Sequence, residues 1–190
     1  VGQMLQMPAV RWVCLYFFAA CAVELTFGTW CSTYLVEIRS ITPSMAANIA
    51  LFYYLGIAVG RFVSGLLSVK LSGWKLIGLG LIGIVSAILL LLLPLPKAFC
   101  SGILFPAGVG VGPLFPNMMH LTGKNFSPDI ALSISGIQMT ATYTGILLMP
   151  ALFGLLAQCI SASLYPKYLL ALTIIVILAF WGLIRCNKNV

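Results

Sequence analysis

The residue with the clearest potential for chemistry is Glu24, a carboxylate inside the long apolar stretch 12–36. A charged carboxylate at mid-membrane costs about 3 kcal/mol on insertion scales, so it is retained where it is protonated, paired or open to water. Arg61 is expected nearer the end of the next stretch, which leaves no basic partner at this depth. Glu24 is therefore a candidate proton-coupling or substrate-binding carboxylate. The alternative is a structural glutamate that is protonated or hydrogen-bonded between helices.

Tyr34 follows Glu24 by about three helical turns and shares roughly one helix face with it. An aromatic ring beside a carboxylate can stack on the apolar C–H faces of a sugar while the acid accepts hydroxyl donors. Tyr34 is accordingly a candidate substrate contact, with aromatic packing between helices as the alternative.

Asn117 and Gln138 are polar amides inside later apolar stretches. Asn117 shares a helix face with His120, and Gln138 shares one with Thr142, by spacings of three and four. The amides are expected either to line an aqueous cavity or to form hydrogen bonds between helices. His120 is close to the end of its stretch and is expected to be an interface histidine.

The segment that carries Asn117 is poorly suited to a straight helix. It contains three alternating glycines at 108–112, directly followed by Pro113, and a further proline at Pro116. Proline removes a backbone donor and clashes with the preceding turn, so a bend or partial break is expected here. Broken helices at membrane depth are tolerated where freed backbone groups face a cavity or find side-chain partners, and a kink for packing alone is the alternative.

A second cluster of interest is Gly56-x-x-x-Gly60, followed by Arg61 and Gly65. Small residues at this spacing let helices approach closely. Arg61 is expected to reach a cytoplasmic interface or a helix C-terminus, where its contact would open and close as a gate, and plain snorkelling to the interface is the alternative.

The composition decides what kind of elements position these residues. The 190 residues are 62% hydrophobic and only 7% charged, too few charges to cover a water-soluble domain. The net charge of +7 comes from single Lys and Arg residues between apolar stretches, without a basic run, which argues against a nucleic-acid partner. The six cysteines show neither a Cys-x-x-Cys pair nor metal-ligand spacing, so no metal or other cofactor is expected.

Uninterrupted apolar stretches of about 20 residues predict an all-α membrane protein with six transmembrane helices in a single domain, 1–190. Most Lys and Arg residues fall on the side of the N-terminus, which the positive-inside rule assigns to the cytoplasm, and an even number of spans returns the C-terminus to that side. A multi-pass protein of the cell membrane with both termini cytoplasmic is expected. The predicted spans are about 12–36, 46–69, 75–93, 98–122, 129–157 and 165–184.

A weak internal repeat appears when the chain is shifted by 89 residues, which corresponds to three spans. An odd number of spans per unit would insert the second copy upside down, so the pattern predicts two inverted three-helix repeats. The matched residues are Tyr54 with Tyr143, Gly56 with Gly145, and the triplet 65–67 with 154–156.

These features resemble the C-terminal half of a major facilitator superfamily transporter, and most closely its fucose-permease-like branch of sugar:proton symporters. The resemblance implies twelve spans with a cavity between two halves, and therefore an N-terminal six-helix half or a second copy as partner. It also implies proton-coupled transport of a small polar, sugar-like solute across the lipid bilayer. The residues that carry it are the stretch 24–30 with Tyr34, Gly60-Arg61-x-x-x-Gly65, the stretch 112–116, and Gln138 with Pro150, Gly154, Ala157 and Gln158.

The resemblance has a departure in the Gly60-Arg61 region. The superfamily's loop motif usually carries an Asp, and Ser64-Gly65 stands at that place here. A charge clamp through that acid is therefore not expected in this half. The role of Glu24 is not carried over from the family and rests on its membrane depth.

Two other protein classes fit six apolar helices. An intramembrane serine protease needs Gly-x-Ser-Gly, but Phe62 stands where the first glycine belongs before Ser64, and His120 is the single histidine, so no enzyme activity is expected. A non-catalytic membrane subunit or a channel-like helical partner is the remaining alternative, although no filter segment or polar pore-lining repeat is present.

Overall fold

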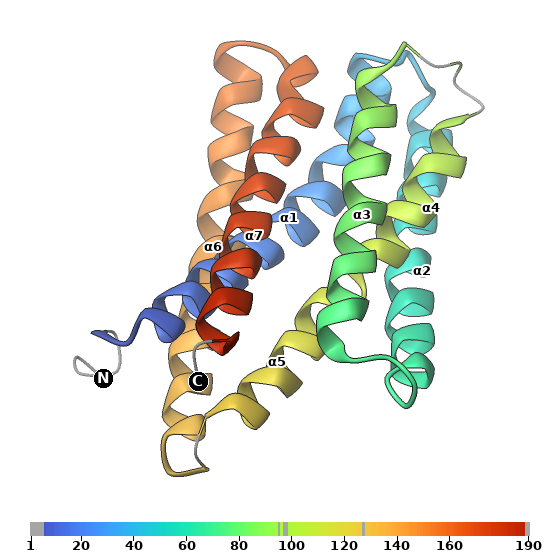
Figure 1. Cartoon of the computed structure of the whole chain (residues 1–190). Coiled ribbons are helices and arrows are strands. Elements are labelled where there is room, and N and C mark those ends of the chain that lie inside the picture. The colour runs from blue at the N-terminus through green and yellow to red at the C-terminus, as the bar shows by residue number, and fades with distance from the viewer. Residues whose placement is uncertain (1–5, 95, 97–98, 127, 189–190) are drawn as a thin grey trace.

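The computed structural model describes residues 6–94, 96, 99–126 and 128–188, and no β-strand occurs among them. The first transmembrane crossing is made by α1 (Pro8–Glu37), and the chain then continues through short connections (Figure 1). The other elements are α2 (Pro43–Leu67), α3 (Gly73–Leu92), α4 (Phe99–Val111), α5 (Leu114–Asn125), α6 (Pro128–Cys159), the 3-10 helix η2 (Ala162–Leu164) and α7 (Tyr165–Lys188).

Among the described residues, six helical segments are long and apolar enough to cross a membrane, in agreement with the predicted number of spans. The fourth of them combines α4 and α5 over Gly102–Lys124. The chain is therefore a multi-pass membrane protein. α1 begins and α7 ends at the same end of the helix bundle, where the α2–α3 and α5–α6 connections also lie (Figure 1).

Several helix boundaries differ from the predicted spans. α1 begins at Pro8 rather than near residue 12, and α2 begins at Pro43 rather than near residue 46. Both helices start on a proline, whose fixed φ suits the first helical turn and whose missing N–H is no loss there. A span placed by apolar length alone misses such polar or neutral first turns. The predicted start of the fourth span at residue 98, like Lys97, lies outside the described residues.

The predicted break in the fourth span is confirmed at Gly112 and Pro113, which separate α4 from α5. A Cβ atom on Gly112 would lie 2.7 Å from both the Ile57 carbonyl oxygen and the Arg61 nitrogen of α2, so only glycine allows this approach. The Asn117 side chain donates to the Pro113 carbonyl oxygen at 2.8 Å. A side-chain donor thus serves the backbone where the helix is interrupted.

The helices form two packed groups, and each group combines helices from the first and second halves of the chain. α1 lies against α6 and α7, while α4 lies against α2 and α3. The backbones of α2 and α4 touch at Gly56, where an added Cβ would collide with the Phe105 carbonyl oxygen, and those of α6 and α1 touch at Gly145, where it would collide with the Phe18 carbonyl oxygen. Close backbone approach of this kind is how helices gain packing contacts inside lipid.

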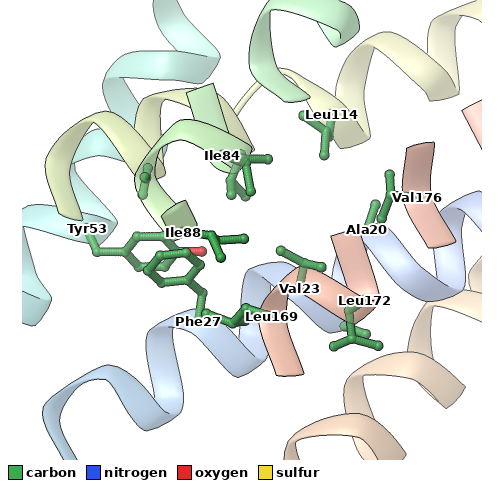
Figure 2. Close-up of a cluster of buried hydrophobic side chains, with 14 of the residues drawn as sticks. Ala20, Val23, Phe27, Tyr53, Ile84, Ile88, Leu114, Leu169, Leu172 and Val176 are labelled. Carbon is green, nitrogen blue, oxygen red and sulfur yellow. The ribbon is translucent and has the colours of Figure 1, made fainter. Parts of the chain in front are cut away.

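The centre of the bundle is an apolar cluster to which every helix from α1 to α7 contributes, and Figure 2 shows the part formed by α1, α2, α3, α5 and α7. The rings of Phe27 and Tyr53 stack with centroids 4.8 Å apart and planes 9° from parallel. Buried tyrosine hydroxyls reach helix carbonyls: Tyr53 donates to the Glu24 carbonyl oxygen at 2.9 Å and Tyr165 to the Phe27 carbonyl oxygen at 2.6 Å. These bonds hold the middle of α1 against its neighbours, which is where Glu24 lies.

The contacts of Gly60 and Gly65 predict different effects of an alanine substitution at these two positions. Gly60→Ala is expected to destabilise the protein by about 1–3 kcal/mol, because the new methyl group would collide with the Val109 carbonyl oxygen of α4. Gly65→Ala is the matched control, since a Cβ there meets nothing within 4 Å. Thermal unfolding in detergent measures both, and an equal effect of the two changes would contradict the packing argument.

Candidate functional site

The structure pairs Glu24 of α1 with Arg61 of α2. Arg61 Nη2 donates to Glu24 Oε1 over 2.7 Å, and the Arg61 and Glu24 side chains are 50% and 25% exposed. The prediction that no basic residue reaches the depth of Glu24 is therefore wrong. Glu24 lies 13 residues before the end of α1 at Glu37 and Arg61 lies 18 residues after the start of α2 at Pro43, an offset of five residues or about 7.5 Å. A long arginine side chain together with helix tilt closes that offset.

The pair joins helices that are also tied through their backbones. The Tyr53 hydroxyl of α2 donates to the carbonyl oxygen of Glu24 itself. The neighbouring Tyr54 is 47% exposed, and its hydroxyl end lies against Gly28, one turn beyond Glu24. Sequence reasoning assigned no role to Tyr53 and noted Tyr54 only in the repeat, because their closeness to Glu24 depends on how α2 crosses α1.

Asn117 of α5 contacts α2 one turn after Arg61. Its side-chain amide donates to Ser64 Oγ of α2 at 2.7 Å, in addition to the Pro113 carbonyl oxygen. Asn117 is buried, and it lines a cavity of about 340 Å³ together with Arg61 and Gly65. Asn117 thus both lines a cavity and forms a hydrogen bond between helices, which were its two expected positions. A contact between Asn117 and substrate stays a prediction.

The three residues of the predicted gate take different positions. Gly60 packs against Val109 of α4, Arg61 reaches Glu24, and Gly65 faces open space at the cavity. The basic side chain therefore has its partner in the middle of α1 rather than at a helix C-terminus.

Gln138 of α6 is fully buried and its amide nitrogen donates to Thr122 Oγ1 of α5 at 2.8 Å. This is the interhelical bond that was one of its two expected roles. Its amide oxygen is buried and has no partner among the described residues. One turn later, Thr142 lies 3.9 Å from Cys21 Sγ of α1, which links α6 to the helix of Glu24.

Tyr34 is not brought together with Glu24. It lies ten residues further along α1, roughly 15 Å away at 1.5 Å per residue. Its hydroxyl donates to the Leu91 carbonyl oxygen at 3.1 Å and accepts from Arg39 Nε at 3.1 Å. Arg39 also donates from Nη2 to the Leu91 and Leu93 carbonyl oxygens at 2.7 Å each, so it holds the C-terminal end of α3, where a cation is favoured. A role of Tyr34 in substrate binding stays a prediction.

The described residues give no further reactive arrangement. Ser64, which the protease alternative needed, is bonded to Asn117, and no hydrogen bond between Ser64 and His120 occurs in the described part of the chain. Within the same residues, no group of three or more His, Cys, Asp or Glu side chains is placed to hold a metal ion.

No family model matches the chain. Among curated proteins, it is similar to Bypass of stop codon protein 6 of Saccharomyces cerevisiae (strain ATCC 204508 / S288c), with 25% identity over 181 residues. The alignment covers 86% of this chain and 35% of that protein. The chain therefore spans about a third of the length of this relative.

Proposed function

We propose that the chain is one six-helix half of a secondary transporter of the major facilitator type, which moves a small polar, sugar-like solute together with protons. The other half is an N-terminal six-helix unit or a second copy of the chain. The protein lies in the cell membrane with both termini cytoplasmic. The observation that carries the proposal is the partly exposed ion pair between Glu24 and Arg61 within two membrane-spanning helices.

An ion pair between two transmembrane helices is costly unless it has a use. Intramembrane charges are rare, and where they occur they mark substrate or ion pathways. Glu24 and Arg61 are a quarter and a half exposed, so they lie on a face of the bundle that the described part of this chain does not close, where a second half would enclose a cavity. A proton on Glu24 removes the negative charge and weakens the bond to Arg61. The pair is thus a contact with two states, which is what alternating access requires.

The helix packing supports an inverted repeat. α1 packs on α6 and α7, and exchanging the first three spans for the last three turns this set into α4 packing on α2 and α3, which is also observed. The glycines matched by the 89-residue shift, Gly56 and Gly145, make backbone contacts with corresponding helices, to Phe105 of α4 and to Phe18 of α1. Both observations favour two three-helix units related by a pseudo-two-fold axis in the membrane plane.

Charge placement supports the orientation. Arg11, Lys70, Lys75 and Lys124 belong to the end of the bundle where α1 begins, whereas Arg39 and Lys167 belong to the opposite end. The excess of basic residues assigns the first end to the cytoplasm.

Counterflow in proteoliposomes tests the proposal with the complete protein that contains this chain. A panel of labelled monosaccharides, including fucose and galactose, is offered to vesicles preloaded with the same unlabelled sugar. We expect saturable exchange of at least one sugar, because a carrier binds unlabelled sugar on one side of the membrane and labelled sugar on the other, and moves both. Conduction that does not saturate would support a channel, and no flux of any sugar would count against a sugar transporter.

A further inference from the structure

A polar cavity lies where α2 turns into α3, beside the candidate transport site but extending away from Glu24. Its volume is about 340 Å³, and it is bounded by the end of α2, the α2–α3 connection and α5. No Asp or Glu side chain is among the described residues that line it. The residues that line it include Arg61, Lys124 and His120 and the serines Ser64, Ser68 and Ser72.

The first turn of α3 adds to the positive character of this cavity. Ser72 precedes α3, its side chain makes no capping hydrogen bond, and both Ser72 and Gly73 line the cavity. The first N–H groups of a helix have no partner within it and carry a partial positive charge. Arg61 gives one N–H to Glu24, and a guanidinium has five. The Ser68 hydroxyl donates to the Gly65 carbonyl oxygen. The cavity therefore offers Lys124, the remaining N–H groups of Arg61 and the hydroxyls of Ser64 and Ser72, and such donors are the surroundings that a phosphate group prefers.

An apolar groove continues from this cavity into the membrane-spanning part of the bundle. It has a volume of about 460 Å³ and is bounded by α2, α3 and α4. Along α3 the cavity ends at Gly73 and the groove begins at Leu76, and along α4 and α5 the groove ends at Pro113 and the cavity begins at Pro116. Ser64 lines both. Along α2 the two spaces lie side by side, at 61–68 for the cavity and 60–67 for the groove, so they adjoin at this helix and follow one another along α3, α4 and α5.

We propose that the cavity and the groove together bind one anionic phospholipid, with its phosphate against Arg61 and Lys124 and an acyl chain along the groove. Charge complementarity selects an anionic headgroup, because Lys124 and Arg61 line the cavity without a carboxylate, and Arg61 gives only one of its N–H groups to Glu24. A free phosphate would use the cavity alone and leave the apolar groove without a role. The site lies at the end of the bundle with the excess of basic residues, where anionic lipids are enriched if that end is cytoplasmic. This binding does not depend on transport activity.

Native mass spectrometry of the purified, delipidated complete protein tests the site with added phosphatidylglycerol or phosphatidylcholine. We expect one tightly bound phosphatidylglycerol and weaker binding of phosphatidylcholine, whose headgroup is zwitterionic. Lys124→Gln is expected to weaken phosphatidylglycerol binding about five-fold, the effect of one basic residue on an anionic headgroup. Lys70→Gln is the matched control, because Lys70 lies at the same end but does not line the cavity.

A second variant tests the groove, and competition with inorganic phosphate tests whether the site binds a free anion instead of a lipid. A Cβ on Gly83 meets no atom closer than 3.5 Å, so Gly83→Leu can be accommodated and would fill the groove. It is expected to weaken phosphatidylglycerol binding while Lys124 is intact. Equal binding of the two lipids, or equal effects of Lys124→Gln and Lys70→Gln, would overturn the proposal. So would displacement of the lipid by millimolar inorganic phosphate together with no effect of Gly83→Leu, which would indicate a site for a free anion.

Discussion

On the proposed transport function, replacing Glu24 with glutamine is expected to reduce proton-driven uptake by the complete protein that contains this chain to the level of empty vesicles. Glutamine has nearly the shape of glutamic acid, so it can still accept a hydrogen bond from Arg61 across the 2.7 Å contact. It cannot release a proton, and the variant is therefore held in the state that corresponds to protonated Glu24. Uptake driven by an imposed pH gradient, measured in proteoliposomes, checks the loss.

A carrier that has lost only its coupling keeps part of its cycle. Counterflow by Glu24→Gln should accordingly persist without an imposed gradient, and its rate should no longer depend on pH. Glu37→Gln is the matched control, since Glu37 is exposed at the end of the same helix. Full uptake with an unchanged pH profile in Glu24→Gln would leave Glu24 with a structural role.

Arg61→Gln is expected to destabilise the protein by about 1–3 kcal/mol. Removing one partner of a fully buried ion pair costs about 3–5 kcal/mol because it leaves a charge without a counter-ion. The smaller value applies here because the Arg61 and Glu24 side chains are 50% and 25% exposed and water can take over part of the lost contact. Thermal unfolding in detergent, with Lys75→Gln as an exposed control near the start of α3, measures the difference.

The double variant Glu24→Gln/Arg61→Gln separates the pair from each residue alone. If the cost of Arg61→Gln comes from an unpaired Glu24, removing that charge as well should restore most of the lost stability. Proton-driven uptake should stay absent in the double variant. Additive destabilisation by the two single changes would contradict an energetic coupling between Glu24 and Arg61.

For the candidate site, the sequence predicts which residues matter better than it predicts which residues they contact. Glu24, Arg61 and Asn117 were each identified from residue type and membrane depth, yet their contacts were not. The Glu24–Arg61 bond was missed because residue counts put Arg61 too far towards the C-terminal end of α2. Tyr34 shares a helix face with Glu24, as the spacing indicates, but its hydroxyl is used at the other end of the bundle by Leu91 and Arg39.

The local properties of the chain were determined by the sequence itself. The six spans follow from the length of the apolar stretches, and the interruption of the fourth span follows from Gly112 and Pro113, because both depend on backbone chemistry within a few residues. Only the tertiary structure decided which polar side chains meet: Glu24 with Arg61, Asn117 with Ser64, and Gln138 with Thr122. Each of these pairs joins two different helices, so its distance depends on helix tilt, offset and rotation. Those quantities are set by packing across the whole bundle, at glycine contacts such as that of Gly60 with Val109, and not by spacing along the chain.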